Sequence, residues 1–552
     1  MSTTIKISKL LENALQKAQN SKKLPKFSIE NIIVEKPRNK SFGNWSCNIA
    51  MVLAKELKKS PIDIAKIIHQ NIEKNEEIET IDIVNPGFIN FTLSESFRSN
   101  LIEQILNEKN SFGSNVNGKG KKIQLEFVSV NPTGPVHVGH ARGAIVGSCI
   151  ANILTFSGYD VTKEYYVNDA GNQIDLYVDS IKSKIFENFG NMFPFPEDGY
   201  KGKQVEEISN KVIAELSIKK ENLDEIEDKK IKNESINITL DQIKKDLCDI
   251  GINYDNWFFE SSLFSNETIQ FVENKLKEKK LIFEKDGAIW FKSSEFFTEN
   301  DVVIQRSKNE GHTYFFSDMA YHYDKFNLRK FDIVINIFGA DHHSHVDRLK
   351  SAVKALDIDP ENLKILLTQI VHFKNQNKVE KFSKRSGNIY TVRDLINIVG
   401  KDVCRFNFLN RSLDSQQEFD LELATKESSE NPVFYVQYAY ARLCSIINSY
   451  DDINNIKEVD LSMLKTKFEK DLIDNLDFFP QIVIDSAENL QTQNLTQYSI
   501  DLAKDLQKFY ENCRVISDDK ELTKARIILI SACKIVLKNA LDIMGINSPE
   551  RM

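Results

Sequence analysis

Residues 123–140 read IQLEFVSVNPTGPVHVGH and decide the fold of the middle of this 552-residue chain. Their first eight residues are rich in β-branched and aromatic side chains, which is typical of a buried strand. Pro132, Gly134 and Pro135 then end that strand, and a helix is predicted from about His137 through Leu154. A strand, a Pro/Gly loop and a helix in this order open a nucleotide-binding α/β fold of the Rossmann type.

Two histidines mark the predicted start of this helix. His137 and His140 are three residues apart, so both project from one helix face. A helix N-terminus favours phosphate, and imidazoles placed there can donate hydrogen bonds to phosphate oxygens as charge builds in a transition state. Gly139 lies between them, and because it has no side chain, a planar ring of a ligand could approach the helix there. An isolated H-x-G-H pattern usually belongs to surface or core histidines, so it is the place of this one after a strand and loop that indicates a nucleotide site.

A basic segment lies far downstream, where residues 381–388 read KFSKRSGN. Lys381, Lys384 and Arg385 precede a flexible Ser-Gly-Asn stretch. Such a loop can close on a triphosphate and neutralise leaving pyrophosphate, because charge-assisted contacts to phosphate are strong. Taken alone, such a segment is usually a solvated basic turn.

The remaining sequence predicts a multidomain α/β protein. Residues 1–115 indicate a small N-terminal α/β domain, and residues 116–400 a Rossmann-type domain with inserted, highly charged helices around 190–250. Residues 401–552 read as amphipathic helices without a convincing strand, which predicts an all-α terminal domain. We expect helices at 49–57 and 62–72 and strands at 81–84, 88–93, 288–291, 302–305 and 333–338.

Composition narrows the class of protein further. Hydrophobic residues make up 41% and charged residues 28%, as in ordinary globular proteins. The sequence has no apolar run of the roughly 20 residues that span a bilayer and does not start like a secretory signal, so a cytoplasmic protein without membrane contact is expected. Seven scattered cysteines without a Cys-x-x-Cys pair favour reduced thiols over a disulfide framework or zinc ribbon.

Charge is unevenly distributed along the chain. The net charge of −8 argues against indiscriminate binding of polyanions. Residues 1–40, however, carry nine Lys or Arg residues against three acids. That segment is compatible with a surface that contacts a phosphate backbone, and also with a solvated helix face in a lysine-rich protein.

Together, HVGH at 137–140 and KFSKR at 381–385 resemble the two signatures of class I aminoacyl-tRNA synthetases. Phe382 stands where the family usually has methionine, and we expect it to serve as the same hydrophobic anchor. Other stretches resemble the arginyl-tRNA synthetases in particular, in family order. They are residues 126–143, 168–173, 284–288, 313–322, 339–343 and 431–442, and the C-terminal SPERM at 548–552.

The resemblance implies ATP and L-arginine as substrates, Mg²⁺ accompanying ATP, tRNA(Arg) as partner, a monomer, and no structural metal. A guanidinium has five donors and a permanent charge, so an arginine pocket needs carboxylates and planar acceptors. By resemblance, the catalytic residues are His137, His140, Lys381 and Lys384. The ATP-binding residues are Gly139, Gly339, Asp341 and His342, and the arginine-binding residues are Glu126, Asn131, Glu260, Tyr314 and Asp318.

Three alternatives stay open. Residues 341–345 (DHHSH) could bind zinc, although no partner Cys/His cluster is evident. The chain could also charge another amino acid, or be a non-catalytic tRNA-binding paralogue. The SPERM tail and the 431–442 stretch argue against a different amino acid, and the intact His and Lys set argues against a paralogue.

Two segments depart from the family pattern. Residues 190–250 match it weakly. Phe42 and Asn44 stand where His and Asp are more usual, in a domain that the family is thought to use for the outer corner of tRNA. The strength of that contact is therefore not predicted.

Overall fold

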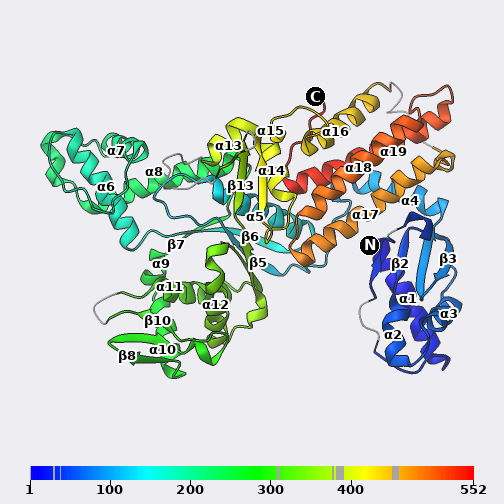
Figure 1. The fold of residues 1–552 in the computed structure, drawn as a ribbon, viewed down its shortest axis with the longest axis horizontal. Coiled ribbons are helices and arrows are strands. Elements are labelled where there is room, and N and C mark those ends of the chain that lie inside the picture. The colour runs from blue at the N-terminus through cyan, green and yellow to red at the C-terminus, as the bar shows by residue number, and fades with distance from the viewer. Residues whose placement is uncertain are drawn as a thin grey trace.

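The computed structural model describes residues 2–28, 32–37, 39–307, 311–375, 378–380, 391–450 and 459–552. Figure 1 shows an elongated molecule whose central sheet lies between inserted helices at one end and a C-terminal helical bundle at the other. The N-terminal domain, in blue, lies against the bundle. The multidomain α/β fold class is thereby confirmed. None of the described helices has the length and apolar character needed to cross a membrane.

The N-terminal domain is a four-stranded antiparallel sheet packed against helices. Ser60 caps one of these helices and Pro61 occupies its first turn. Trp45 and Phe91 face each other across two paired strands and are buried in the core. The helices are α1 (Thr3–Asn20), α2 (Ile49–Leu57) and α3 (Pro61–Asn71), and the strand order is β1 (Val34–Glu35), β2 (Trp45–Cys47), β4 (Phe88–Leu93), β3 (Ile78–Val84).

The central sheet has five parallel strands, with the strand of the HVGH motif in the middle. The order is β12 (Leu363–Thr368), β11 (Ile333–Gly339), β5 (Lys122–Phe127), β6 (Asp160–Val167), β7 (Asn256–Phe259). Helix α5 (Val138–Phe156) follows β5 and packs closely against it. The closeness is seen at Gly147, where a Cβ atom would come within 2.5 Å of the Phe127 ring. The predicted strand–loop–helix unit is thus present, and its loop opens at the carboxyl edge where such sheets bind ligands.

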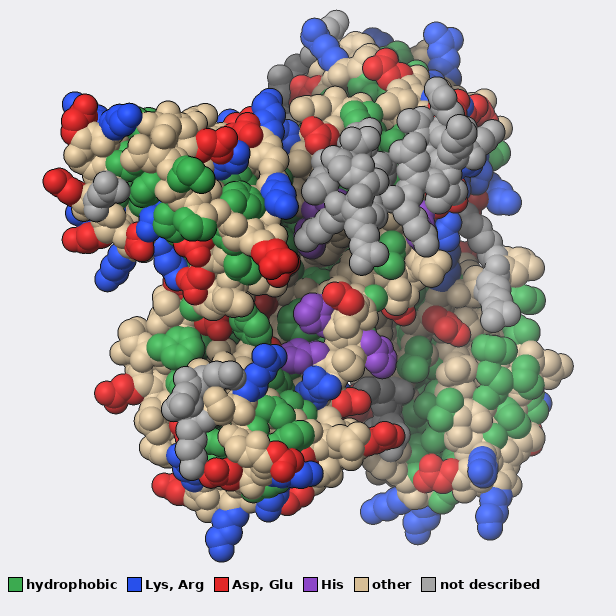
Figure 2. All heavy atoms as spheres, turned by 60° about the vertical axis from the view of Figure 1, so that its left-hand side comes forward, with side chains coloured by type: hydrophobic (Ala, Val, Ile, Leu, Met, Phe, Trp, Pro, Cys, Tyr) green, Lys and Arg blue, Asp and Glu red, His purple; other side chains and the backbone are tan. Residues whose placement is uncertain are grey.

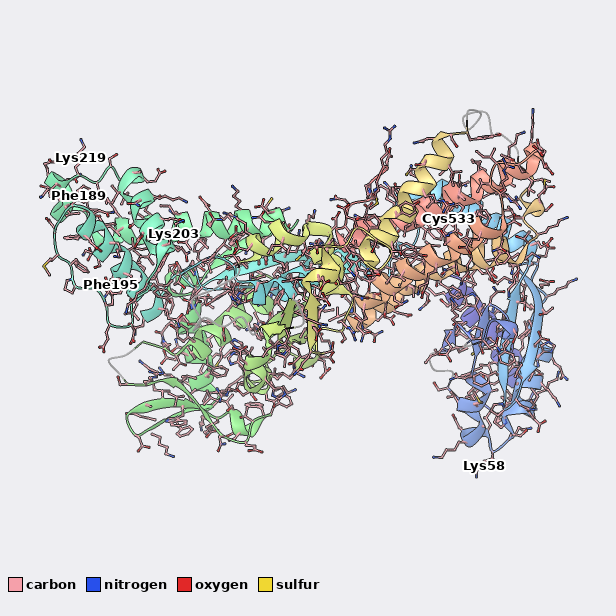
Figure 3. The ribbon with its side chains drawn as sticks, turned by 45° about the horizontal axis from the view of Figure 1, so that its top comes forward. Lys58, Phe189, Phe195, Lys203, Lys219 and Cys533 are labelled. Carbon is pink, nitrogen blue, oxygen red and sulfur yellow. The ribbon has the colours of Figure 1, made fainter. Side chains whose placement is uncertain are left out.

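Two insertions extend this sheet. The first, between β6 and β7, contains helices α6 (Asn172–Asn188), α7 (Lys203–Glu215) and α8 (Asp228–Asp249), whose outer end carries Phe189 and Lys219 in Figure 3. The second, between β7 and β11, packs around a separate hydrophobic core that it shares with residues 334–363. It comprises α9 (Ser261–Ser265), α10 (Thr268–Glu278), β8 (Ile282–Lys285), β9 (Ala288–Phe291), β10 (Val302–Gln305), α11 (Tyr314–Tyr323) and a π-helical turn at Asp324–Leu328.

The C-terminal part is mostly helical. Its helices are α13 (Val392–Val399), α14 (Lys401–Leu409), α15 (Leu421–Ala424), α16 (Pro432–Asn448), α17 (Lys467–Asn489), α18 (Gln493–Asn512) and α19 (Lys520–Met544). The sequence indicates no strand beyond about residue 400, yet β15 (Gln417–Asp420) pairs in parallel with β13 (Val371–Asn375), beside β14 (Lys378–Glu380). Strand β15 has four residues, and Phe419 is its one buried apolar side chain. So short a segment shows no alternation of apolar and polar residues, and the strand is recognised only by its pairing with β13.

The N-terminal domain docks on helix α17 through buried polar contacts. Asp477 accepts hydrogen bonds from the Trp45 indole, at 2.9 Å, and from the Thr3 hydroxyl. Burial raises the pKa of Asp477 to about 6. Beside it, the Arg98 guanidinium forms a two-pronged ion pair with Asp474, at 2.8 and 3.2 Å. These contacts are satisfied only when the two domains lie together, and so they define their relative placement.

Candidate active site

The predicted site residues that the structure describes lie at the carboxyl edge of the central sheet. Figure 2 shows several histidine side chains in a hollow there, between the lobe of the second insertion and the rest of the molecule. The elements next to the hollow are the carboxyl ends of β5, β6 and β11 and the helices α11 and α12 (His343–Ala355). This is the topological position at which parallel α/β sheets bind ligands.

The loop after β5 has an unusual backbone. Val128 and Ser129 have positive φ angles of 74° and 42°, which cost about 1–3 kcal/mol each for residues other than glycine. Surrounding groups fix this conformation. The Ser129 hydroxyl accepts from the Tyr166 N–H at 3.0 Å, and the Tyr165 hydroxyl donates to the Val130 carbonyl at 2.7 Å. The loop is therefore held rigidly where it leads into the histidine pair.

The two histidines stand at the start of α5, as predicted. His137 is the N-cap, and its Nδ1 accepts from the Gly139 N–H at 2.9 Å. In the neutral ring the proton is therefore on Nε2, the atom that can donate to a ligand. The His140 ring is exposed and lies 6.2 Å from the His137 ring, nearly perpendicular to it.

The residues that follow the basic segment lie beside the histidine pair. Lys381, Phe382 and Lys384 lie outside the described residues. Immediately after them, Thr391 forms a β-bridge with His137, and the Val392 N–H donates to the Val136 carbonyl at 2.9 Å. The chain thus returns from the basic segment directly beside the histidine pair, although the two motifs are far apart in sequence.

An acidic pocket surrounds the Tyr166 ring. Burial raises the pKa of Tyr166, and the nearby carboxylates of Glu260, Asp318, Glu126 and Asp169 raise it further. Glu260 is only 4% exposed. Its pKa is raised to about 7, mainly by burial and then by the charges of Asp318 and Asp169, against hydrogen bonds from Ser317 and Tyr166. Carboxylates crowded in this way favour a cationic ligand.

Two further predicted residues contact the segment that follows β6. Tyr314 is 54% exposed at the start of α11. Its hydroxyl approaches Gly171 so closely that a Cβ atom there would lie 3.0 Å away, and Gly171 also has a φ of 90°, so glycine is required at that position. Asn131 donates to the Gln173 amide oxygen. Glu126, Glu260 and Asp318 therefore lie near Tyr166, whereas Tyr314 and Asn131 contact the segment that follows β6. That these five residues bind arginine stays a prediction.

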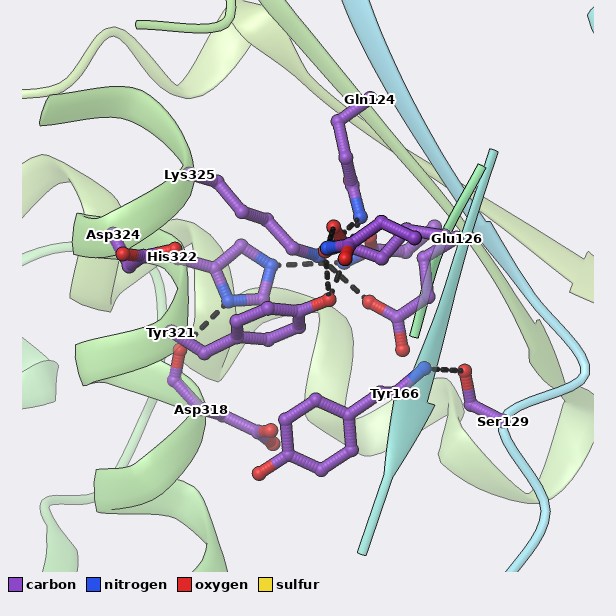
Figure 4. A network of polar contacts seen from close by, with 12 residues as sticks. Gln124, Glu126, Ser129, Tyr166, Asp318, Tyr321, His322, Asp324 and Lys325 are labelled. Atoms are coloured by element: carbon purple, nitrogen blue, oxygen red, sulfur yellow. Dashed lines mark hydrogen bonds and ion pairs between the residues drawn. The ribbon is translucent and has the colours of Figure 1, made fainter. Parts of the chain in front are cut away.

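A buried polar network supports the Glu126 carboxylate and the backbone of Asp318 (Figure 4). Lys325 is fully buried, and its Nζ lies 2.7 Å from Glu126 Oε2 and 3.1 Å from Asn336 Oδ1. The Asn336 amide donates in turn to His322 Nε2 at 2.8 Å, which leaves the His322 proton on Nδ1 to donate to the Asp318 carbonyl at 2.7 Å. Burial, followed by the charge of Lys325, holds the pKa of His322 well below its usual value, so the ring is neutral.

The predicted ATP-binding segment follows β11. Gly339 ends that strand, and Asp341 and His342 are exposed in a 3₁₀ turn before α12. The zinc alternative for this segment finds no support. Within the described ranges, no three His, Cys, Asp or Glu side chains form a group that could hold a metal ion. His345, the last of the three histidines, instead contacts Asp318.

Comparison with known proteins decides the family. Residues 6–93 match the arginyl tRNA synthetase N-terminal domain, residues 101–412 the class I (R) tRNA synthetase catalytic domain, and residues 436–552 the DALR anticodon binding domain. The chain belongs to the arginyl-tRNA synthetase family. The arginine–tRNA ligase of Caldanaerobacter subterraneus is 43% identical over 98% of this chain and 97% of its own, and that of Acetivibrio thermocellus is 40% identical over 99% and 98%.

Solved structures agree on the fold. Arginyl-tRNA synthetase from Thermus thermophilus superposes with a TM-score of 0.77 at 21% identity, covering 99% of this chain and all of that one. The three domain models of the arginyl-tRNA synthetase family therefore map onto the three units described above. The predicted boundaries at residues 115 and 400 stay a prediction.

A cationic cleft lies where the family's N-terminal and anticodon-binding domains meet. It has a volume of about 490 Å³ and opens beside the N-terminus of α17, which Thr466 caps. Its two acids are Asp471 and Asp474. Its cations are Lys36, Arg98, Lys465, Lys467 and Lys470. Positive charge thus predominates here, although the chain as a whole is negative, and the cleft suits a phosphate backbone.

Proposed function

We propose that this chain activates L-arginine with ATP and transfers the arginyl group to tRNA(Arg), at the carboxyl edge of the central sheet. The observation that carries the proposal is the cluster of four carboxylates around Tyr166, at the same carboxyl edge of the central sheet from which the histidine pair at the start of α5 follows. A guanidinium fits the acidic pocket, and a helix N-terminus with two imidazoles fits a triphosphate. The two substrates of arginine activation would therefore lie side by side.

Arginine binds with its guanidinium in the acidic pocket. Asp318 and Glu260 supply carboxylate oxygens to the guanidinium, and Glu126 adds to the negative field. Tyr314 and Asn131 close the pocket at its entrance. The substrate carboxylate is then directed toward the nucleotide.

ATP occupies the neighbouring part of the hollow. Gly139 allows the base to approach α5, while Gly339, Asp341 and His342 hold the nucleoside side. An arginine carboxylate oxygen attacks the α-phosphorus, the bond to the bridging oxygen breaks, and pyrophosphate leaves with that electron pair. His137 and His140 donate to the phosphate oxygens, Lys381 and Lys384 neutralise the pyrophosphate, and Mg²⁺ accompanies the triphosphate as part of the substrate.

The tRNA spans all three units. Its terminal adenosine enters the hollow and its 2′-hydroxyl takes the arginyl group, with release of AMP. The match of residues 436–552 to an anticodon binding domain and the cationic cleft beside α17 support binding along the other end of the molecule. We further propose that the protein is a cytoplasmic monomer and that activation requires bound tRNA.

Arginine-dependent ATP–pyrophosphate exchange, measured with and without total tRNA, tests the function. Exchange that needs arginine and tRNA together is the expected result. Exchange that depends on another amino acid would support amino-acid activation by ATP but contradict the proposed specificity for arginine. No exchange under any condition, with tRNA still bound, would favour a non-catalytic paralogue.

The titration of Glu260 gives a pH-dependent prediction. Its pKa of about 7 means that the free protein at pH 6 holds a proton that a bound guanidinium must displace. The KM for arginine is therefore expected to fall about tenfold between pH 6 and pH 8, whereas the KM for ATP changes little. In Glu260→Gln the KM for arginine is expected to be higher and independent of pH. A pH dependence of equal size in this variant would assign the titration to another group.

A further inference from the structure

His345 contacts the acidic pocket from the nucleotide side, and the function proposed above gives it no role. It lies in the first turn of α12, directly after the predicted ATP-binding segment. Its Nε2 is 2.8 Å from Asp318 Oδ2, and the two side chains are 19% and 32% exposed. This contact connects α12 to α11, the helix that carries both Tyr314 and Asp318.

The His345 ring has a fixed orientation. The Phe315 ring meets it edge to face, with centroids 5.8 Å apart and planes at 82°. The Phe338 ring lies 6.4 Å away and the His342 ring 6.3 Å away. Aromatic neighbours in these arrangements restrict the rotation of the imidazole, so its Nε2 is aimed at Asp318 before any substrate binds.

Asp318 is consequently held at two points. Its backbone carbonyl accepts from His322, at 2.7 Å, and its side chain contacts His345. The terminal torsion of an aspartate is otherwise broad, so an unsupported carboxylate would turn among several orientations. A donor on Oδ2 fixes the carboxylate plane and thereby the direction of Oδ1.

We propose that His345 is a positioning residue for arginine: its Nε2–H holds Asp318 Oδ2, so that Oδ1 faces the guanidinium. This inference rests on the proposed function, in which Asp318 binds the guanidinium. Because recognition of a planar guanidinium depends on the orientation of its acceptors, loss of the hydrogen bond weakens arginine binding without removing the charge. The donor comes from the helix that follows the ATP segment, so the two substrate sites share this contact.

The test compares His345→Leu with His345→Gln in the full-length protein. Leucine removes the donor, and the KM for arginine is expected to rise about tenfold or more, with the KM for ATP within about twofold of the wild-type value. The glutamine amide can place a donor near the position of Nε2, so His345→Gln is expected to recover most of the loss. Lys354→Gln, at an exposed position on the same helix, is the matched control and should behave as wild type.

Asp318→Asn separates this inference from the function on which it rests. If Asp318→Asn raises the KM for arginine and His345→Leu does not, the positioning role is wrong and the function stands. If His345→Leu raises the KM values for arginine and ATP together, or if glutamine recovers nothing, the histidine has only a structural role and the proposal is overturned. If the wild-type protein does not activate arginine with tRNA present, the proposed function itself fails.

Discussion

Replacement of Lys325 by methionine is expected to lower the free energy of local unfolding of the central sheet by about 3–5 kcal/mol. Lys325 is fully buried and contacts Glu126 at 2.7 Å, and its methylene stem is close in size to methionine. The variant therefore removes the charge and keeps most of the packing. What remains is a buried Glu126 carboxylate without its cation, and an Asn336 oxygen without its donor.

Native-state hydrogen exchange measures this effect on the amides of β5 and β11, which flank the network. Local exchange suits a chain with several domains, whose global unfolding is not a single transition. The double variant Lys325→Met with Glu126→Gln is the control, because it leaves no uncompensated charge in the interior and is expected to recover much of the loss. A single variant within 1 kcal/mol of wild type would show that Glu126 is neutralised by another route.

The network also shows what the sequence could and could not predict. The HVGH strand–loop–helix unit was predictable, because a strand, a Pro/Gly loop and a helix are encoded by neighbouring residues. Lys325 gave no signal, since it lies in a π-helical turn between α11 and β11 and resembles any other lysine in the chain. Only the fold brings it to Glu126, which is almost two hundred residues earlier in the sequence.

The same distinction holds within the site. Resemblance to a family predicted Asp318, and His345 belonged to a stretch that could bind zinc, but no sequence pattern indicated that these two side chains contact each other. Likewise, the positive φ angles at Val128 and Ser129 depend on hydrogen bonds from distant Tyr166 and Tyr165. Local chemistry was predictable where one segment carries it, and the supporting contacts were not, because their partners come from other helices and strands.

Replacement of His140 by alanine is expected to lower the rate of arginine activation about 10²- to 10³-fold, while binding of tRNA is retained. His140 is exposed at the start of α5, so its removal leaves the core intact. A donor aimed at the transferring phosphate acts where charge develops in the transition state, and its loss therefore falls on kcat more than on the KM for ATP. His137 is less suitable for this test, because as the N-cap it also accepts the Gly139 N–H, and its removal would disturb the helix.

ATP–pyrophosphate exchange and tRNA filter binding, measured on the same preparation, separate chemistry from binding. His69→Ala, an exposed histidine on α3 of the N-terminal domain, is the control and should leave exchange unchanged. If His140→Ala and wild type exchange at equal rates, the hollow is not where phosphate charge is stabilised, whatever the resemblance of its motifs. If exchange is lost and tRNA binding falls with it, the histidine acts through the architecture of the site. Loss of exchange alone, with tRNA binding retained, would identify His140 as a group that acts on the phosphate.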